Sequence, residues 1–314
     1  MTEFISGVAC GAIVVDLTIS TYSGRKKDRK TQDEVVAAKG SGSSKAASVY
    51  KSLFAECKEL EAITKYGAVV RASHYRLTRP WTDMGSRILP TARLLEYCDV
   101  MTAHDTEFGK LVRAFLDKYD TLVSAAAFQL GTLFDRAEYP SRGNLAGKFG
   151  ITRAEYPLPT GGDWRLDLDA ERQQELVEKY QKRFETQLAA AQQENWQKLH
   201  AALTTFSVKL VDKEDENGKV KPQKLYESMI DGAQDLVGLL KDMNFGKDPA
   251  LEKARQQLEN AINGVTIADL RKSEGTRVLT KQKVDAVLSA FDWGDTEDED
   301  ADISEAVAVA AATD

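Results

Sequence analysis

The longest regular pattern in this chain is a pair of helical stripes of apolar residues between positions 93 and 212. In the first stripe, apolar side chains recur every three or four residues at Leu94, Cys98, Met101, Phe108, Val112, Phe115, Tyr119, Leu122, Ala126 and Leu133. The second stripe has the same spacing at Leu176, Tyr180, Phe184, Leu188, Ala191, Leu199, Leu203, Phe206 and Leu210. This spacing places apolar residues on one face of a helix. Because stripes of roughly 60 Å need a partner along their whole length, we predict a long antiparallel helical hairpin resembling a coiled coil.

The chain before this hairpin has the pattern of a small α+β region, over positions 1–90. Alternating apolar and polar residues predict a strand over 11–22, which ends at Ser23 and Gly24. Thr31 and Glu34 have the spacing of a capping box and predict a short helix. We expect a further helix over 45–65 and an extended segment over 67–75, followed by a crossing loop that leads into the first arm.

The two arms are separated by a tip at 136–167, which is rich in glycine, proline and aromatic residues and contains the strand-like sequence ITRAEYPL. After the second arm, three shorter helices are expected over 225–243, after Asp248 and Pro249, and over 280–291. The predicted fold is therefore mostly α: a hairpin over 91–212 with a short β-containing tip, and C-terminal helices over 213–291. Residues 292–314 form an acidic tail that is expected to be disordered.

The formal net charge of the chain, -7, is set by this tail. From Asp292 onward there are nine carboxylate side chains and no Lys or Arg, so the rest of the chain carries a charge of +2. Positions 1–90 hold 14 Lys and Arg against nine Asp and Glu. The acidic composition thus hides a mildly basic body with an acidic tail, so the net charge of the whole chain is a poor guide to its partners.

The three cysteines, Cys10, Cys57 and Cys98, are odd in number and have no ligand or redox spacing. They favour a reducing compartment, and we expect a cytoplasmic protein. The N-terminal apolar run has no basic segment before it and is interrupted by Asp16, so neither a signal peptide nor a membrane segment is predicted.

Motifs for catalysis or metal binding are missing from the sequence. The histidines His74, His104 and His200 lie in separate elements and lack a zinc motif, although His104 and His200 would lie at the same level of the hairpin. No phosphate-binding glycine loop or nucleophile elbow is present. We therefore expect no catalytic residues, no cofactor and no metal, and an enzyme is the least favoured class.

The most informative chemical feature is the cluster of cations after the first strand: Arg25, Lys26, Lys27, Arg29 and Lys30. Such a cluster can neutralise nucleic-acid phosphates, and the alternative is a solvated turn that protects an edge strand. Arg142, Lys148 and Arg153 in the tip are candidates for the same role. They alternate with the aromatic residues Tyr139, Phe149 and Tyr156, which either stack on unpaired bases or form a small core of the tip.

Residues 14–30, VVDLTISTYSGRKKDRK, resemble a family of uncharacterised proteins of bacteriophages and some bacteria. In that family a strand ending in a Ser-Gly-Arg-Lys-Lys turn opens the chain, and a long helical region follows. The resemblance implies a phage or mobile-element origin and a cytoplasmic setting. Members of the family look as though they often accompany AAA-type ATPase and von Willebrand-type genes, which implies an adaptor role.

Two functions follow as hypotheses. The first is a non-enzymatic nucleic-acid-binding protein, oligomeric through its long helices, that binds DNA or RNA through the cation cluster and the tip, with the acidic tail as a competitor. The second is a scaffold or adaptor whose helical hairpin binds a protein, such as an AAA-type ATPase or a virion component.

Overall fold

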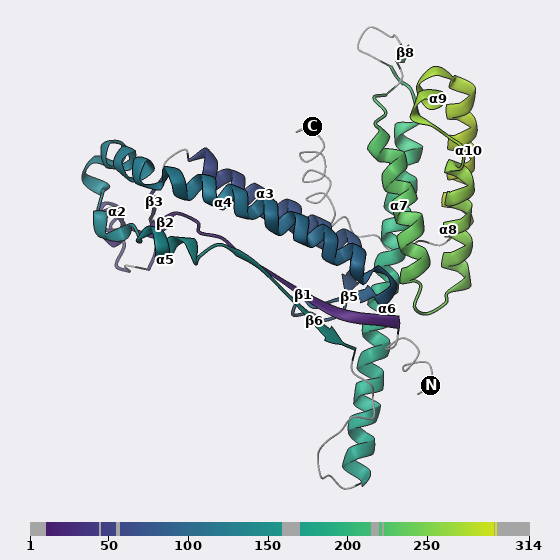
Figure 1. Cartoon of the computed structure of the whole chain (residues 1–314), viewed down its shortest axis with the longest axis horizontal. Helices are drawn as coiled ribbons and strands as arrows, with labels where there is room; N and C mark the ends of the chain where they lie inside the picture. Colours follow the sequence, from purple (N-terminus) through teal and green to yellow (C-terminus); the bar gives the residue numbers. More distant parts are fainter. Residues whose placement is uncertain are drawn as a thin grey trace. The chain divides into compact units, whose positions relative to one another are not determined.

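A computed structural model describes residues 11–43, 45–54, 57–158, 170–214, 220–221, 223–291 and 293, which are mostly helical (Figure 1). The helices are α2 (Arg29–Ala38), α3 (Lys58–Leu77), α4 (Leu94–Leu130), α5 (Arg142–Ala146), α6 (Ala170–Lys209), α7 (Glu227–Met243), α8 (Pro249–Ile262), α9 (Ile267–Lys272) and α10 (Glu274–Ala290). The strands are β1 (Ala12–Ser20), β2 (Arg25–Lys27), β3 (Tyr50–Ser52), β4 (Arg79–Pro80), β5 (Arg87–Pro90), β6 (Gly150–Pro157), β7 (Lys213–Glu214) and β8 (Val220–Lys221). The predicted mostly α fold with a small β part is confirmed.

The chain divides into two compact units, each assembled from separated segments. Unit 1 contains Met1–Asp16, Tyr75–Tyr97 and Ala154–Ala301, and unit 2 contains Leu17–His74, Cys98–Arg153 and Asp302–Asp314. The units therefore do not coincide with the contiguous ranges 1–90, 91–212 and 213–291. The predicted disordered tail lies outside the described residues, except for Trp293.

A small sheet in the order β4-β5-β1-β6 includes the strand predicted over 11–22 and the strand predicted in the tip. In unit 1, β1 pairs antiparallel with β5, with Ile13 opposite Leu89, and β5 pairs antiparallel with β4. The expected crossing loop therefore contributes two strands. Trp81, which follows β4, packs edge-to-face on Phe184 of α6, with ring centroids 5.2 Å apart. This contact lies in the apolar cluster that covers the sheet.

The C-terminal half of α6 forms the main core of unit 1 with α7, α8 and α10. Leu199, Leu203 and Phe206 of α6 are buried there. The three predicted C-terminal helices are present as α7, α8 and α10, and the short helix α9 precedes α10. Asp248 caps α8 by accepting hydrogen bonds from the backbone N–H groups of Ala250 and Leu251, at 2.8 and 3.3 Å.

The core of unit 2 forms between α3 and α4 and is aromatic. Phe54 packs edge-to-face on Phe115 of α4, with centroids 5.9 Å apart, and edge-to-face on Tyr139, with centroids 5.4 Å apart. The Tyr139 hydroxyl donates to the Leu53 carbonyl oxygen at 2.7 Å. The Tyr119 hydroxyl likewise donates to a carbonyl oxygen, that of Pro140, at 2.7 Å. These bonds satisfy the polar ends of rings that are otherwise buried.

Two sequence predictions in this unit were wrong. Residues 67–75 were expected to be extended but belong to α3, whose buried stripe consists of Leu60, Ile63, Gly67, Val70, His74 and Leu77. A glycine and two adjacent valines in this stretch hid a regular helical period. The helix expected over 45–65 begins only at Lys58, because residues 50–52 form β3 and the next two, Leu53 and Phe54, enter the aromatic core.

The predicted seam between the two long helices is not confirmed. Both helices exist, as α4 and α6, but their apolar stripes enter separate clusters among the described residues. Phe108, Phe115 and Tyr119 of α4 pack in the core of unit 2 with residues from α3. The stripe of α6 packs on the sheet through Phe184 and on α7, α8 and α10 through Leu203 and its neighbours. Each stripe therefore has a partner that is not the other arm.

Candidate nucleic-acid interface

The five predicted cations lie on a short antiparallel ribbon and on the helix that follows it. Arg25, Lys26 and Lys27 form β2, which pairs with β3 in the register Arg25–Ser52, Lys26–Lys51 and Lys27–Tyr50. We call β2, β3 and the first turn of α2, with these cations, the basic ribbon. It begins at Gly24, whose φ of +62° is in the left-handed region.

The ribbon has one face that contacts the rest of unit 2 and one that does not. Residues directly opposite each other in an antiparallel pair point to the same face, and neighbours along a strand point to opposite faces. Lys51 lies on the contacting face: its Nζ donates to the Leu133 carbonyl oxygen at 2.7 Å and pairs with Glu138 at 2.7 Å. Lys26, directly opposite Lys51, lies on the same contacting face, whereas Arg25 and Lys27 lie on the other, open face; all three side chains are exposed.

The remaining two cations, Arg29 and Lys30, are exposed in the first turn of α2. Between them and β2 lies Asp28, the N-cap of the helix, which accepts bonds from the Thr31 backbone N–H at 3.1 Å and hydroxyl at 2.9 Å. The hydrogen bond from the Thr31 backbone N–H lowers the pKa of Asp28. The single carboxylate within the run is thus directed at the helix end rather than at the cations.

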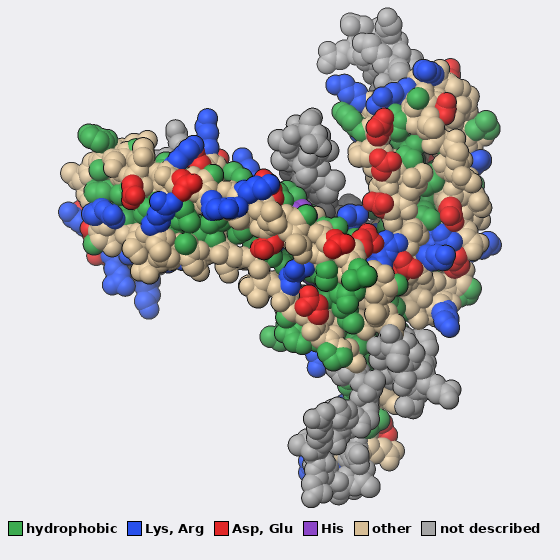
Figure 2. Space-filling model, viewed as in Figure 1, with side chains coloured by type: hydrophobic (Ala, Val, Ile, Leu, Met, Phe, Trp, Pro, Cys, Tyr) green, Lys and Arg blue, Asp and Glu red, His purple; other side chains and the backbone are tan. Residues whose placement is uncertain are grey.

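None of the five cations forms an ion pair with any residue in the described part of the chain. β2 and α2 belong to unit 2, and Figure 2 shows Lys and Arg side chains at the end of this unit where Figure 1 labels β2 and α2, as well as along α3 and α4. Close like charges repel and strongly attract polyanions. The ribbon therefore carries a local concentration of positive charge with no ion-pair partner among the described residues.

The structure divides the three tip cations. Arg142 forms an ion pair with Asp117 of α4. Arg153 of β6 donates to the Cys98 carbonyl oxygen at 3.4 Å. The Nζ of Lys148 lies 5.3 Å from the ring centroid of Tyr22, two residues before Gly24. The structure thus brings Lys148 beside the start of the ribbon, whereas Arg142 and Arg153 contact α4.

Of the tip aromatics proposed for base stacking, two pack in the core of unit 2. Tyr139 is only 4% exposed, and Phe149 packs on Phe115 with centroids 5.8 Å apart. Tyr156 of β6 remains 49% exposed. Tyr139 and Phe149 therefore do not form a separate core of the tip, because they pack on Phe54 and Phe115 in the core of unit 2.

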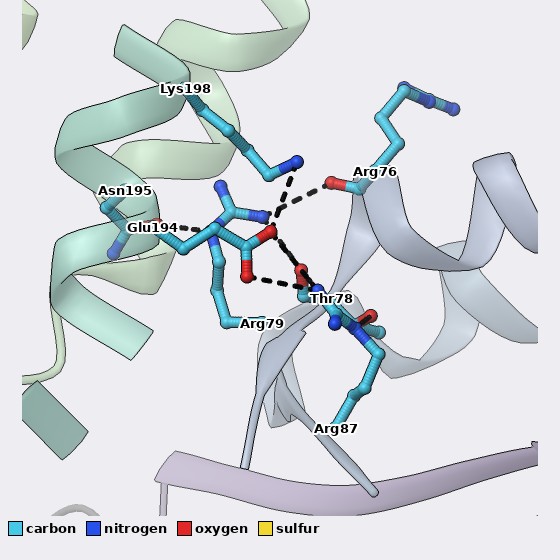
Figure 3. Close-up of polar contacts among 7 residues, drawn as sticks. All are labelled: Arg76, Thr78, Arg79, Arg87, Glu194, Asn195 and Lys198. Atoms are coloured by element: carbon cyan, nitrogen blue, oxygen red, sulfur yellow. Dashed lines mark hydrogen bonds and ion pairs between the residues drawn. The ribbon is translucent and has the colours of Figure 1, made fainter. Parts of the chain in front are cut away.

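A buried polar cluster in unit 1 had no signal in the sequence (Figure 3). Arg79 of β4 is fully buried, and its Nε donates to Asn195 Oδ1 of α6 at 2.5 Å. Its Nη1 donates to the Thr78 carbonyl oxygen at 2.8 Å, whereas Nη2 has no partner among the described residues. Burial lowers the pKa of Arg79 to about 10. The Asn195 amide in turn donates to the Met243 carbonyl oxygen at 3.1 Å, so the cluster links β4, α6 and α7.

Glu194 is the carboxylate at the centre of this cluster, and Figure 3 shows it between Lys198 and Arg87. Arg87 Nη2 contacts both carboxylate oxygens at 3.2 Å, and Lys198 Nζ lies 3.1 Å from Oε1. Burial lowers the pKa of Lys198, and neighbouring Arg79 lowers it further. One carboxylate thus balances three cations, and the contacts fix the β4–β5 pair on α6.

A groove of about 580 Å³ in unit 1 is lined by Glu185, Leu188, Ala189, Gln192, Gln193, Trp196, Gly246, Asp248 and Trp293. Of its two carboxylates, Asp248 caps α8 and accepts from Trp196 Nε1 at 3.1 Å. The loop of Gly246 approaches α6 closely: a Cβ there would lie 2.2 Å from Gln192 Nε2, so the Gln192 side chain would have to move.

The structure gives the two helical histidines different partners. His104 lies between α3 and α4, with Nδ1 2.9 Å from the Tyr66 hydroxyl and Nε2 2.9 Å from the Ser73 hydroxyl. Burial raises the pKa of Tyr66, and the contacts of His104 join α3 to α4. His200 stacks on Trp293, with centroids 5.0 Å apart.

Other potential sites give no support to a metal or membrane role. Within the described ranges, no three His, Cys, Asp or Glu side chains are grouped in a way that could hold a metal ion. Cys57 is buried and Cys98 half-buried, both as free thiols. Among the described helices, none has the length and apolar character needed to span a bilayer.

Comparisons with known proteins add no assignment. Neither the protein-family models, nor the curated proteins, nor the solved structures with which the chain was compared give a match.

Proposed function

We propose that this chain is a non-enzymatic protein that binds DNA or RNA through the basic ribbon. The observation that carries the proposal is the set of five exposed cations on β2 and the start of α2, which have no ion-pair partner among the described residues. Cations held on ordered backbone neutralise phosphates without first having to leave an internal partner. Lys148, beside Tyr22, extends the positive surface toward the tip.

A charge-matched pair of variants tests this site. In the first, Arg25, Lys26, Lys27, Arg29 and Lys30 are all changed to Gln. In the control, five exposed cations on α3 and α4 of the same unit are changed to Gln: Lys58, Lys65, Arg71, Lys110 and Arg113. Both variants lower the net charge equally.

We expect the ribbon variant to lose at least tenfold in affinity for a labelled oligonucleotide, measured by fluorescence anisotropy, and the control to lose much less. Equal losses would show that binding depends on overall charge and would remove the ribbon as the site. Unchanged affinity in both variants would also reject it.

The acidic tail is proposed to compete with nucleic acid for the basic surface. Truncation after Phe291 is a poor test, because Trp293 packs on Trp196 with centroids 5.6 Å apart. A better variant replaces the seven carboxylates at positions 295–305 by their amides in the full chain. Tighter oligonucleotide binding is the expected result, and unchanged binding would assign the tail another role.

A second function, a scaffold or adaptor, is favoured by one observation. Phe128 of α4 is 91% exposed, and a large apolar side chain in this position is typical of a contact with another chain. An AAA-type ATPase, a virion component or a second copy of this chain would be candidate partners. If α4 is a docking face, Phe128→Ser lowers the concentration-dependent mass measured by light scattering, whereas the control Leu279→Ser, at 62% exposure on α10, does not. A monodisperse monomer would count against self-association.

A further inference from the structure

Tyr50 lies on the open face of the basic ribbon. It is the first residue of β3, directly opposite Lys27 in the register of the ribbon. Because directly opposite residues share a face and alternate residues along a strand do too, Tyr50, Lys27 and Arg25 lie on one face of the ribbon. Lys51 marks the opposite face through its contact with Glu138.

The ring of Tyr50 is free in a way that other tyrosines of unit 2 are not. It is 61% exposed, whereas Tyr119 and Tyr139 are buried and donate to backbone carbonyl oxygens. The ring of Tyr22 is occupied by Lys148. Within the described residues, the hydroxyl of Tyr50 has no hydrogen-bond partner. An aromatic ring is thus held by strand pairing beside two cations, with its face open.

We propose that the basic ribbon binds single-stranded nucleic acid, with Tyr50 as the platform on which a base stacks while Lys27 and Arg25 contact the adjoining phosphates. This inference rests on the proposed function and names the form of nucleic acid recognised. A duplex already uses the faces of its bases in stacking, whereas a single strand offers them to an aromatic side chain. A ribbon face that holds an aromatic ring opposite one cation and near a second therefore matches a flexible strand.

The test uses three labelled probes of equal length with the full chain: a 12-nucleotide oligo(dT), the same backbone with abasic sites, and a 12-base-pair duplex. The abasic strand keeps the phosphates and removes the bases, so it separates stacking from electrostatics. We expect oligo(dT) to bind more tightly than both other probes. Tyr50→Ala should weaken oligo(dT) binding roughly 5- to 150-fold and leave abasic binding unchanged.

Two variants complete the test. Tyr50→Phe keeps the ring and should retain oligo(dT) affinity, and Tyr226→Ala, which removes a tyrosine 58% exposed in unit 1, should have no effect. Tyr50→Ala that leaves oligo(dT) affinity unchanged, or tighter binding of the duplex, would overturn the single-strand inference while leaving the ribbon as a phosphate site. Failure of all three probes to bind would overturn the proposed function itself.

Discussion

The contacts of Glu194 can be tested by a substitution that removes one negative charge and little volume. Glu194→Gln leaves Arg79, Arg87 and Lys198 together without a counter-charge. The side chains of Arg87, Glu194 and Lys198 are only 12%, 19% and 28% exposed, so water compensates poorly for the loss. We expect the variant to destabilise unit 1.

The magnitude follows from the geometry. A pair of unit charges about 4 Å apart gains roughly 4 kcal/mol at an effective dielectric constant of about 20. The amide oxygen of Gln can still accept one bond from Arg87 or Lys198, which returns about 1 kcal/mol. The net loss in the free energy of unfolding is therefore about 3 kcal/mol, in the range for breaking a buried ion pair.

Tryptophan fluorescence in urea is a suitable assay, because all four tryptophans of the chain lie in the segments of unit 1. Glu175→Gln is the matched control: it removes a carboxylate from the same helix, α6, where the pair with Lys179 is 56% and 69% exposed and contributes at most about 1 kcal/mol. Equal effects of the two substitutions would refute the importance of Glu194.

The pH dependence of the Glu194→Gln variant provides a second check. Burial already lowers the pKa of Lys198 from 10.5, and loss of Glu194 lowers it further. Between this lowered pKa and 10.5, the unfolded chain binds more protons than the folded one, so stability contributed by this group rises with pH. We therefore expect the deficit of the variant to narrow as the pH approaches 10.5. A loss of unfolding free energy that stays the same at every pH would contradict the repulsion assigned to Arg79, Arg87 and Lys198.

Three further predictions concern other parts of the fold. Hydrogen bonds from Arg255 lower the pKa of Glu252 to about 2. Glu252→Gln should therefore lower the free energy of unfolding, measured in urea, by about 1 kcal/mol at pH 7. The difference between the variant and the original protein should disappear as the pH falls from 4.5 toward 2. Gly24→Ala combines a φ of +62° with a Cβ 2.9 Å from Leu60 Cδ2 and should cost about 1–2 kcal/mol in thermal unfolding followed by circular dichroism. Burial raises the pKa of Tyr139 to about 12, so the stability that the neutral Tyr139 contributes should be lost as the pH rises from 10 through 12. The Tyr139→Phe variant has no hydroxyl to ionise and should not show this decrease in alkaline unfolding.

The sequence predicts elements better than it predicts their partners. Alternation identifies β1, and the long apolar stripes identify α4 and α6, because both patterns are local. The seam between the stripes was not confirmed. An apolar stripe indicates that this face of the helix is buried, but it does not indicate which element covers it. Val70 and Gly67 show the same limit within one helix: they fit the buried face of α3, but their intrinsic preferences favour other structures.

The charge pattern of the sequence identified the candidate site, but it did not predict the geometry of that site. Clustering of Lys and Arg identifies the ribbon cations, but the pairing of β2 with β3 joins residues far apart in the sequence, and β2 has no strand-forming composition. Tyr50 therefore gave no signal before the register was known. The contact between Arg79 and Asn195 spans 116 positions and has no local pattern at all.

The central claim, that the basic ribbon is a phosphate-binding surface, is tested most directly by the salt dependence of oligonucleotide affinity. Anisotropy titrations of the full chain with a labelled single strand at several salt concentrations give the slope of log K against log salt. If up to five ribbon cations contact phosphates, the slope should be negative, with a magnitude up to about 3.5, and the five-Gln ribbon variant should be nearly flat. No binding at the lowest salt, or the same slope in both proteins, would contradict the claim.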